Sequence, residues 1–117
     1  MAESRKTNIQ ILKFLSDDFE PRVRYAVAYN ENATPALLEK LSRDFDWTVR
    51  YAVARNTNTP PETLARLTTV LEIEERVRSA AIQNPSIPLE VWLDAYDSYD
   101  KGLSSAARLN PKHAKRA

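Results

Sequence analysis

Few side chains in this sequence have the types and spacing that catalysis or metal binding needs. Asp94, Asp97 and Asp100 follow one another at intervals of three residues, and three carboxylates could hold a cation. No glycine marks the turn and no glutamate stands where a calcium loop has its bidentate ligand, so a solvated loop is the favoured interpretation. His113 is the only histidine, and it lies in a tail that we expect to be mobile. We therefore expect no catalytic residue, no metal site and no cofactor.

Arginine is the other candidate binding residue, because it recurs at a fixed spacing in the sequence. Three arginines each follow an acidic residue by six positions, and the pairs are Asp18 with Arg24, Asp44 with Arg50, and Glu72 with Arg78. Each guanidinium could bind a phosphate through two parallel hydrogen bonds. It could also bridge to the preceding carboxylate, or to loop carbonyls of a neighbouring unit. An arginine already held by an acid is less available to a ligand, so we favour the structural role.

The arginines belong to a sequence motif that the chain repeats. VRYAVAYN at residues 23–30 returns as VRYAVARN at 49–56 and more loosely as VRSAAIQN at 77–84. The period is 26 residues, with an insertion of two residues before the third copy. A repeat of this length indicates stacked units. The expected organisation is a single domain, 1–117, made of a half repeat 8–17, repeats 18–43, 44–71 and 72–97, a degenerate cap 98–112 and a basic tail 112–117.

Each unit carries two short helical patterns. In the first pattern, the residues expected on one helix face recur at intervals of three and four. Val49, Ala52, Val53 and Asn56 are an example. The second helix should have Thr59 as its N-cap and bury Leu64 and Leu67. Helices this short are marginal alone in water, so packing between units must stabilise them. The sequence predicts an all-α solenoid of about four units, and nothing in it suggests a sheet.

An asparagine follows each first helix, and the four are Asn30, Asn56, Asn84 and Asn110. Asparagine tolerates left-handed backbone geometry, and its side chain can satisfy carbonyls left free at a helix end. We expect these residues to cap helices or to bond loops, and we do not expect them to bind a ligand.

Large side chains occupy positions that the repeat leaves variable. Aromatic residues together with arginine are typical of protein-binding hot spots. We therefore predict a partner-binding surface that contains Tyr25, Tyr29, Trp47, Tyr51 and Arg55. The alternative is that these rings lie over neighbouring units and only stabilise the stack. Phe19 and Phe45, which precede the first helices, are expected in the core.

Composition limits the possible partners and compartments. The 17 basic and 16 acidic residues leave a net charge of +1, so no overall field attracts nucleic acid or an anionic membrane. The absence of cysteine excludes disulfides and thiolate metal sites. No apolar run has the length of a signal peptide or approaches the roughly 20 residues that span a bilayer. We expect a cytoplasmic protein without membrane contact.

The repeated pattern D-x-D/E-x-x-V-R-x-A-V-A-x-N-x-N-T-P-x-x-L-L, most complete at residues 44–67, resembles the leucine-rich repeat variant family. This family is a bacterial relative of the HEAT-type helical repeats, and the resemblance extends over roughly residues 8–112. It implies α-helices alternating with short 3₁₀-helices in a right-handed superhelix. Some members carry an iron–sulfur module bound by cysteines, and that function does not transfer to a chain without cysteine.

The resemblance bears on function only broadly, because HEAT-type repeats serve mainly as scaffolds for protein partners. We expect a non-enzymatic module that presents a solenoid surface to a protein partner, as a monomer or weak homo-oligomer. One HEAT-like branch, the alkylpurine DNA glycosylases, binds DNA on a basic concave face. The alternative is therefore a glycosylase-like nucleic-acid binder that uses the arginine-lined face, and the near-zero net charge weighs against it.

Overall fold

A computed structural model describes the backbone of residues 2–69 and 71–114, with side chains from Asn8 onward. Within these residues the chain forms eight α-helices and no strand, so the predicted all-α class is confirmed. The helices are α1 (Ala2–Leu15), α2 (Pro21–Tyr29), α3 (Pro35–Leu41), α4 (Trp47–Arg55), α5 (Pro61–Leu67), α6 (Glu75–Gln83), α7 (Leu89–Tyr96) and α8 (Lys101–Arg108). Residues 115–117 of the predicted basic tail lie outside the described residues.

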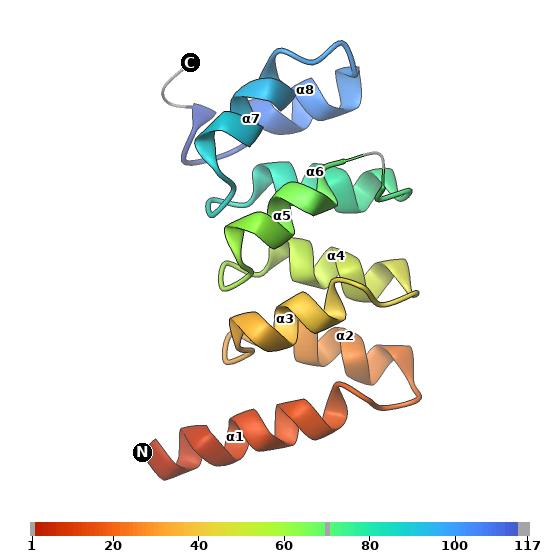
Figure 1. Cartoon of the computed structure of the whole chain (residues 1–117), viewed down its shortest axis with the longest axis vertical. Helices are drawn as coiled ribbons and strands as arrows, with labels where there is room; N and C mark the ends of the chain where they lie inside the picture. The colour runs from red at the N-terminus through yellow and green to blue at the C-terminus, as the bar shows by residue number, and fades with distance from the viewer. Residues whose placement is uncertain (1, 70, 115–117) are drawn as a thin grey trace.

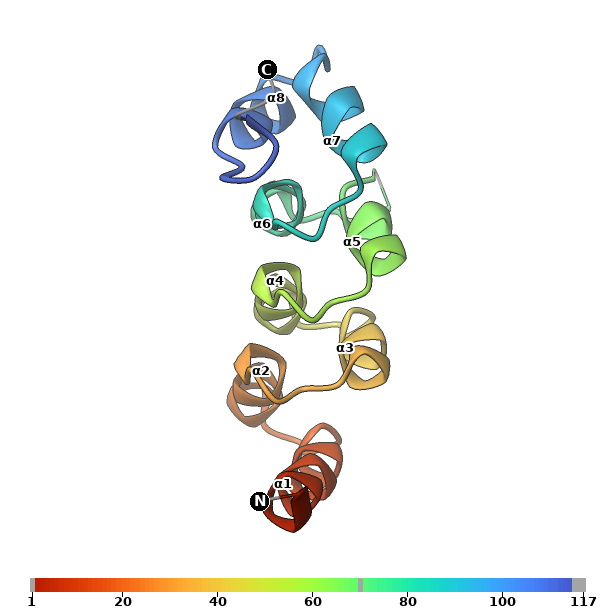
Figure 2. The same ribbon diagram turned by 90° about the vertical axis from the view of Figure 1, so that its left-hand side faces the viewer.

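Successive helices alternate between two columns (Figures 1 and 2). The first helices of the units, α2, α4, α6 and α8, stand in one column, α3, α5 and α7 stand in the other, and α1 lies below and between the two. The stack measures 45 × 29 × 17 Å along its principal axes. It has the arrangement expected of a solenoid, while the right-handed winding stays a prediction. None of the helices in the described part of the chain is both long and apolar enough to cross a bilayer.

The first helices begin at an acidic residue that recurs once per unit. These N-cap residues, whose carboxylates accept a hydrogen bond from the backbone N–H two positions later, are Glu20, Asp46, Glu74 and Asp100. Free N–H groups and the positive end of the helix dipole both favour an anionic side chain there. The repeat therefore fixes where each first helix starts.

The second helices differ from expectation in two ways. They are α-helical and not 3₁₀, because Leu38, Leu64 and Trp92 each donate a backbone hydrogen bond to the carbonyl four residues earlier. Thr59 is not the N-cap of α5, because the helix starts one residue later with Pro60 in that position. The buried Thr59 hydroxyl instead donates to the Val53 carbonyl at 2.7 Å. That bond satisfies a carbonyl at the end of α4, which is why the side chain cannot cap α5.

The core lies between the two columns and repeats with the units. Valines of the first helices face leucines of the second helices, and the fully buried set includes Val27, Val49, Val53, Val77, Leu38, Leu41, Leu64 and Leu67. Trp92 fills the equivalent space in the last unit and donates its indole N–H to the Ala107 carbonyl at 2.7 Å. Each helix is thus held by apolar packing against its neighbours, as helices of this length require.

The N-cap carboxylate of Asp46 gives the stability a pH dependence. The pKa of Asp46 is lowered, first by the hydrogen bond from the Thr48 hydroxyl and then by the one from the Thr48 backbone N–H. A folded-state pKa below the unfolded value means that Asp46 stabilises the fold above about pH 4, and that this contribution is lost as the pH falls through the folded-state pKa. We expect Asp46→Asn, which keeps an N-cap acceptor and removes only the charge, to lower the free energy of unfolding by about 0.3–1 kcal/mol at pH 7. Urea unfolding at pH 7 and pH 2 should show this difference disappearing at pH 2, and a difference of equal size at both pH values would contradict the assignment.

Candidate partner-binding surface

Aromatic side chains cover the outer side of α2 and α4. On α2 the rings of Tyr25 and Tyr29 stack, with centroids 6.0 Å apart and planes inclined by 14°. On α4 the rings of Trp47 and Tyr51 meet edge to face, with centroids 6.1 Å apart. Each pair is separated by four residues, one helical turn, so the helix itself sets the contact. Tyr29 is exposed, whereas Tyr25, Trp47 and Tyr51 also pack against the core.

Two arginines extend this aromatic cluster. The Arg55 guanidinium lies 5.8 Å from the centroid of the Tyr51 ring and donates a hydrogen bond to the Tyr51 hydroxyl at 3.2 Å. This hydrogen bond raises the pKa of Arg55 above its ordinary value. The Arg76 guanidinium of α6 lies 3.9 Å from the centroid of the Trp47 ring and is held there by Glu74 at 2.9 Å. Cation–π contacts of this kind fix the rings in place.

Arg76 is a surface residue that reasoning from the sequence missed. The helix alignment offers the signal, because Trp47 is the first residue of α4 and Arg76 the second of α6, and these helices are neighbours in the first column. The repeat aligns Arg76 with Arg22 and Thr48, so arginine occupies this position in two of the three units.

An open groove of about 630 Å³ runs between α4 and α6. Its walls bring together three of the five predicted residues, and its lining includes Trp47, Tyr51, Arg55, Arg76, Ser79 and Gln83. Tyr25 and Tyr29 stand outside it, on the neighbouring helix α2. The predicted surface is therefore divided into a groove and an adjoining pair of stacked tyrosines.

The recurring arginines join successive units. Arg24 binds both carboxylate oxygens of Asp44, with Nε at 2.7 Å and Nη2 at 3.2 Å, and Arg50 binds Glu72 with Nε at 2.7 Å and Nη2 at 3.1 Å. The expected partner, the acid six residues earlier, contributes only its backbone carbonyl, as Asp18 does to Arg24 at 2.8 Å. The carboxylate comes from the next unit because the guanidinium points along the stack. Arg78 donates only to the Glu72 carbonyl among the described residues.

The recurring asparagines join the same units at the opposite edge. Asn56 donates its carboxamide N–H groups to the carbonyls of Ala28 and Asn30, at 2.9 and 3.0 Å. Equivalent bonds run from Asn84 to α4 and from Asn110 to α6. Asn30, Asn56 and Asn84 are the C-cap residues of α2, α4 and α6, as expected, but they do not use left-handed geometry, since no residue in the described part of the chain has a positive φ. Instead each side-chain oxygen accepts the N–H two residues later, which needs only extended backbone.

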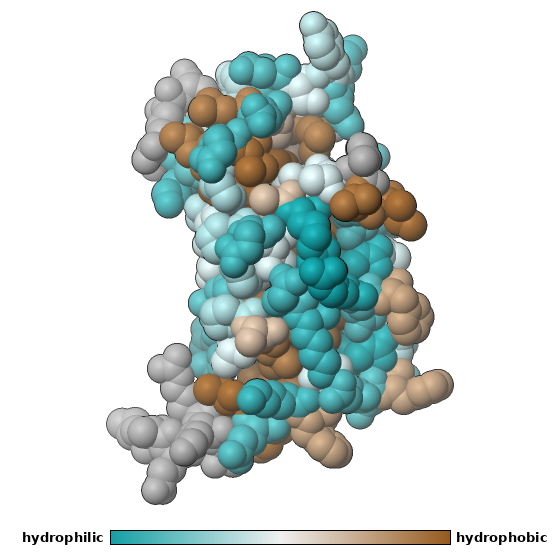
Figure 3. Space-filling view, viewed as in Figure 1, coloured by the Kyte–Doolittle hydropathy of each residue, from teal (hydrophilic) through white to brown (hydrophobic). Residues whose placement is uncertain are grey.

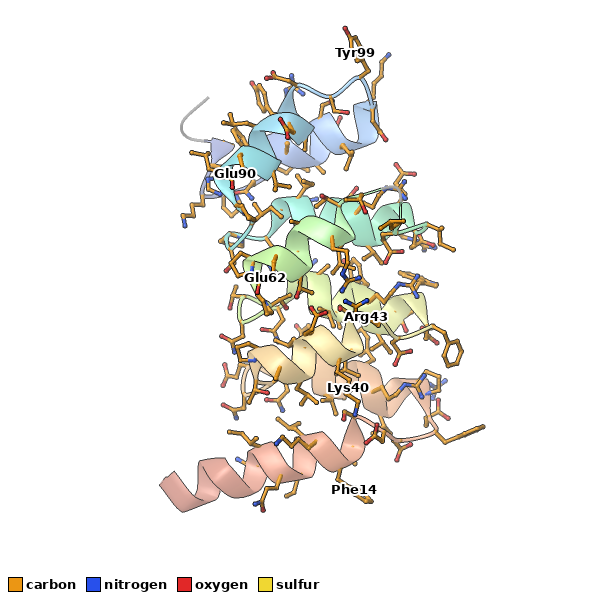
Figure 4. All side chains as sticks on the ribbon, viewed as in Figure 1. Phe14, Lys40, Arg43, Glu62, Glu90 and Tyr99 are labelled. Atoms are coloured by element: carbon orange, nitrogen blue, oxygen red, sulfur yellow. The ribbon has the colours of Figure 1, made fainter. Side chains whose placement is uncertain are left out.

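Phe19 and Phe45 are exposed, so their expected place in the core is wrong. With Ile73 and Tyr99 they occupy one repeat position in the four loops that lead into first helices, and each is at least 85% exposed. The carbonyls of Asp18 and Phe19 both accept hydrogen bonds from Arg24, which turns the loop backbone inward and the ring outward. Apolar atoms project along the right-hand edge in Figure 3, where these loops lie, and Figure 4 shows Tyr99 at the top of that edge.

The residues first considered for catalysis have structural contacts. His113 is buried, its Nε2 lies 2.9 Å from the Ile87 carbonyl oxygen, and its ring packs against Trp92. Asp100 caps α8, and Asp94 and Asp97 are exposed. Within residues 2–69 and 71–114 no group of histidine or acidic side chains is arranged to hold a metal ion.

Helix pairs that repeat along one axis and are joined by the same two kinds of side-chain bond define a helical-repeat protein. Comparison with known families agrees: the model of the leucine rich repeat variant matches residues 47–69, which span α4 and α5. The match confirms the family resemblance at the unit where the repeated pattern is most complete. No curated protein and no solved structure matches the chain.

Proposed function

We propose that this protein is a non-enzymatic interaction module that binds a protein partner through the groove between α4 and α6. The observation that carries the proposal is the ordered set of Trp47, Tyr51, Arg55 and Arg76 on its walls. Aromatic and arginine side chains that are already fixed lose little entropy on binding, which suits them to act as hot spots. The face formed by α3 and α5 offers fewer apolar side chains to a partner, because hydrophilic side chains cover much of it (Figure 3).

The chemistry of the groove indicates what the partner presents. Arg76 is paired with Glu74, whereas Arg55 has no carboxylate within 4 Å among the described residues and bonds only a neutral tyrosine. A partner segment with an apolar side chain for the Trp47 and Tyr51 rings and a carboxylate for Arg55 would match both features. The repeated arginines favour this role over phosphate binding, because Arg24 and Arg50 are already held by carboxylates.

A capture experiment with paired variants tests the proposal. Proteins retained from a native lysate by the wild type should be lost with Arg55→Glu and weakened at least tenfold with Tyr29→Ala, as for hot-spot residues. Arg108→Glu is the matched control, because Arg108 also lies over a tyrosine ring, that of Tyr96, at 4.6 Å. Both variants, Arg55→Glu in the groove and Tyr29→Ala on the adjoining helix α2, should stay within about 1 kcal/mol of wild-type stability. Retention of the same proteins by wild type and Arg55→Glu would refute the groove.

A further inference from the structure

The first unit of the stack has a face that the other units cover. α2 is the lowest helix of its column in Figure 2, and α1 lies below it towards the other column. Ala52 and Ala80 are buried, and so are Val49 and Val77, on helices α4 and α6 that each pack against a preceding first helix. At the same repeat position as these alanines, Ala26 is exposed, and Val23 is only partly buried. The apolar side of α2 therefore lacks the helix that α4 and α6 each have.

The polar bonds between units are incomplete at the same end. Asp18 occupies the repeat position of Asp44, which binds Arg24, and of Glu72, which binds Arg50, but its carboxylate forms no ion pair with an arginine or lysine among the side chains described. Asn30 occupies the same repeat position as Asn56 and Asn84, each of which donates hydrogen bonds to two carbonyls at the end of the preceding first helix. Its side-chain oxygen accepts the Asn32 N–H at 2.8 Å, and its nitrogen bonds no residue from Asn8 to Ala114 that the structure describes.

Exposed apolar side chains on α1 extend the uncovered apolar surface of α2 towards the second column. Ile11 and Phe14 lie three residues apart on the helix, and both are exposed. Figure 4 shows Phe14 on the side of α1 that points away from the rest of the stack. A helix placed below α2 and beside α1 would cover this side of α2, in the way that α2 itself covers α4.

We propose that the N-terminal end of the stack docks an α-helix of another polypeptide, which extends the first column by one helix. The chemistry that this helix must have is given by α2 and α4. It carries small apolar residues facing Ala26, an arginine in its second turn for Asp18, and free carbonyls at its last turn for the Asn30 carboxamide. Bidentate arginine–carboxylate pairs add geometric specificity to such a contact.

A second copy of this chain does not provide that helix. The C-terminal end would present α8, in which Ser104 occupies the position of Arg24 and Arg50. The Asn110 carbonyl, which would face Asn30 of the next copy, accepts the Ala114 N–H at 3.2 Å, just as the Asn56 carbonyl accepts the Thr59 N–H while also bonding Asn84, so the missing arginine alone distinguishes this end. The two ends of the stack are therefore not complementary, and a partner with an arginine is needed.

The probe for this site is a peptide of residues 46–58, acetylated, amidated and held helical by a side-chain bridge on its polar side. It reproduces the helix that carries Arg50 and ends in the carbonyls of Ala54 and Asn56. The bridge is needed because so short a helix does not form alone. Fluorescence polarisation measures its affinity for the full chain, and chemical shifts of amide groups locate it.

We expect saturable binding, with shifts at Asp18, Val23, Ala26 and Asn30. Asp18→Asn in the protein and Arg50→Met in the peptide should each weaken binding about tenfold, and the two together should weaken it hardly further, because they remove one contact. Ala26→Glu, on an exposed helix position, should abolish binding, whereas Asp97→Asn in the last loop between units should have no effect.

Three results would overturn the proposal. The first is no binding at millimolar peptide, and the second is binding that Asp18→Asn and Ala26→Glu leave unchanged. Loss of peptide binding with Arg55→Glu would also contradict the proposal, because it would place the peptide in the groove between α4 and α6 instead. The third is a concentration-dependent dimer of the chain, seen by sedimentation and broken by Asp18→Asn, which would make a second copy the occupant.

Discussion

Replacing Asn84 by alanine is expected to lower the free energy of unfolding by about 2–4 kcal/mol, one of the largest effects of any single polar substitution in this chain. The Asn84 side chain is buried and donates to the carbonyls of Ala54 and Asn56, at 2.8 and 2.9 Å. Its oxygen accepts the Ser86 N–H at 2.8 Å. Alanine would leave the buried Ala54 carbonyl without this partner, the Ser86 N–H without its acceptor and the Asn56 carbonyl with only the Thr59 N–H, and the desolvation of a buried group left unpaired is not recovered.

Chemical unfolding in urea measures this effect, and two further variants make it specific. Asn84→Asp keeps the acceptor but sets a carboxylate against two carbonyl oxygens, so it should destabilise at least as much as alanine. Asn58→Ala is the matched control, because Asn58 also bonds the preceding unit, donating to the Glu31 carbonyl at 2.7 Å, but does so in an exposed position. It should cost less than about 1 kcal/mol. Similar losses for Asn84→Ala and Asn58→Ala would show that burial does not set the strength of these bonds.

Glu72→Ala is expected to destabilise the chain by about 3–5 kcal/mol, because it breaks a buried ion pair by removing one partner. Glu72 is 5% exposed, binds Arg50 with both oxygens and also accepts the Glu74 N–H at 2.9 Å. Without it the Arg50 guanidinium keeps only the Asp44 carbonyl, at 2.8 Å. The charge would be left largely desolvated between α4 and the α5–α6 loop.

Asp17→Ala is the control for this prediction. Asp17 also joins two units, through Lys40 Nζ at 2.6 Å, but both side chains are exposed, by 73% and 48%. Such a pair contributes about 0–1 kcal/mol. The double change Glu72→Leu with Arg50→Met should recover much of the loss, since apolar groups of similar size can replace a buried pair at little cost. Thermal and urea unfolding of the four proteins would show it, and a double variant less stable than Glu72→Ala would contradict the explanation.

The repeat predicted the helices well because burial leaves its period in the sequence. Val49, Val53, Leu64 and Leu67 are all buried as their spacing requires. The recurring asparagines could likewise be assigned to structure, because a polar residue that recurs beside buried ones is commonly bonded to backbone. What the sequence did not disclose is which unit supplies each bonding partner.

Errors arose where a side chain's direction depends on a neighbouring unit. The spacing within one unit suggested Asp18 as the carboxylate for Arg24, but the stack brings Asp44 closer. The same arginine binds the loop carbonyls and so turns Phe19 outward, which composition alone could not indicate. Arg76 was missed because its contact with Trp47 crosses from α6 to α4. Of the candidate surface, the sequence could therefore predict the members within each helix and not the contacts between helices.

The bonds between units tolerate a change in loop length. Arg24 and Asp44 are 20 residues apart, whereas Arg50 and Glu72 are 22 apart, yet the distances from Nε are the same, 2.7 Å. The two extra residues are accommodated in the α5–α6 loop, and Asn84 still reaches α4. Because the α2–α4 and α4–α6 joints use the same pair of couplings, we expect that a unit bounded by them can be duplicated or deleted and that the new neighbours still fit. A shift of one residue within a helix would break both couplings together. Length is thus a variable of this architecture, and the two end faces decide where the stack stops.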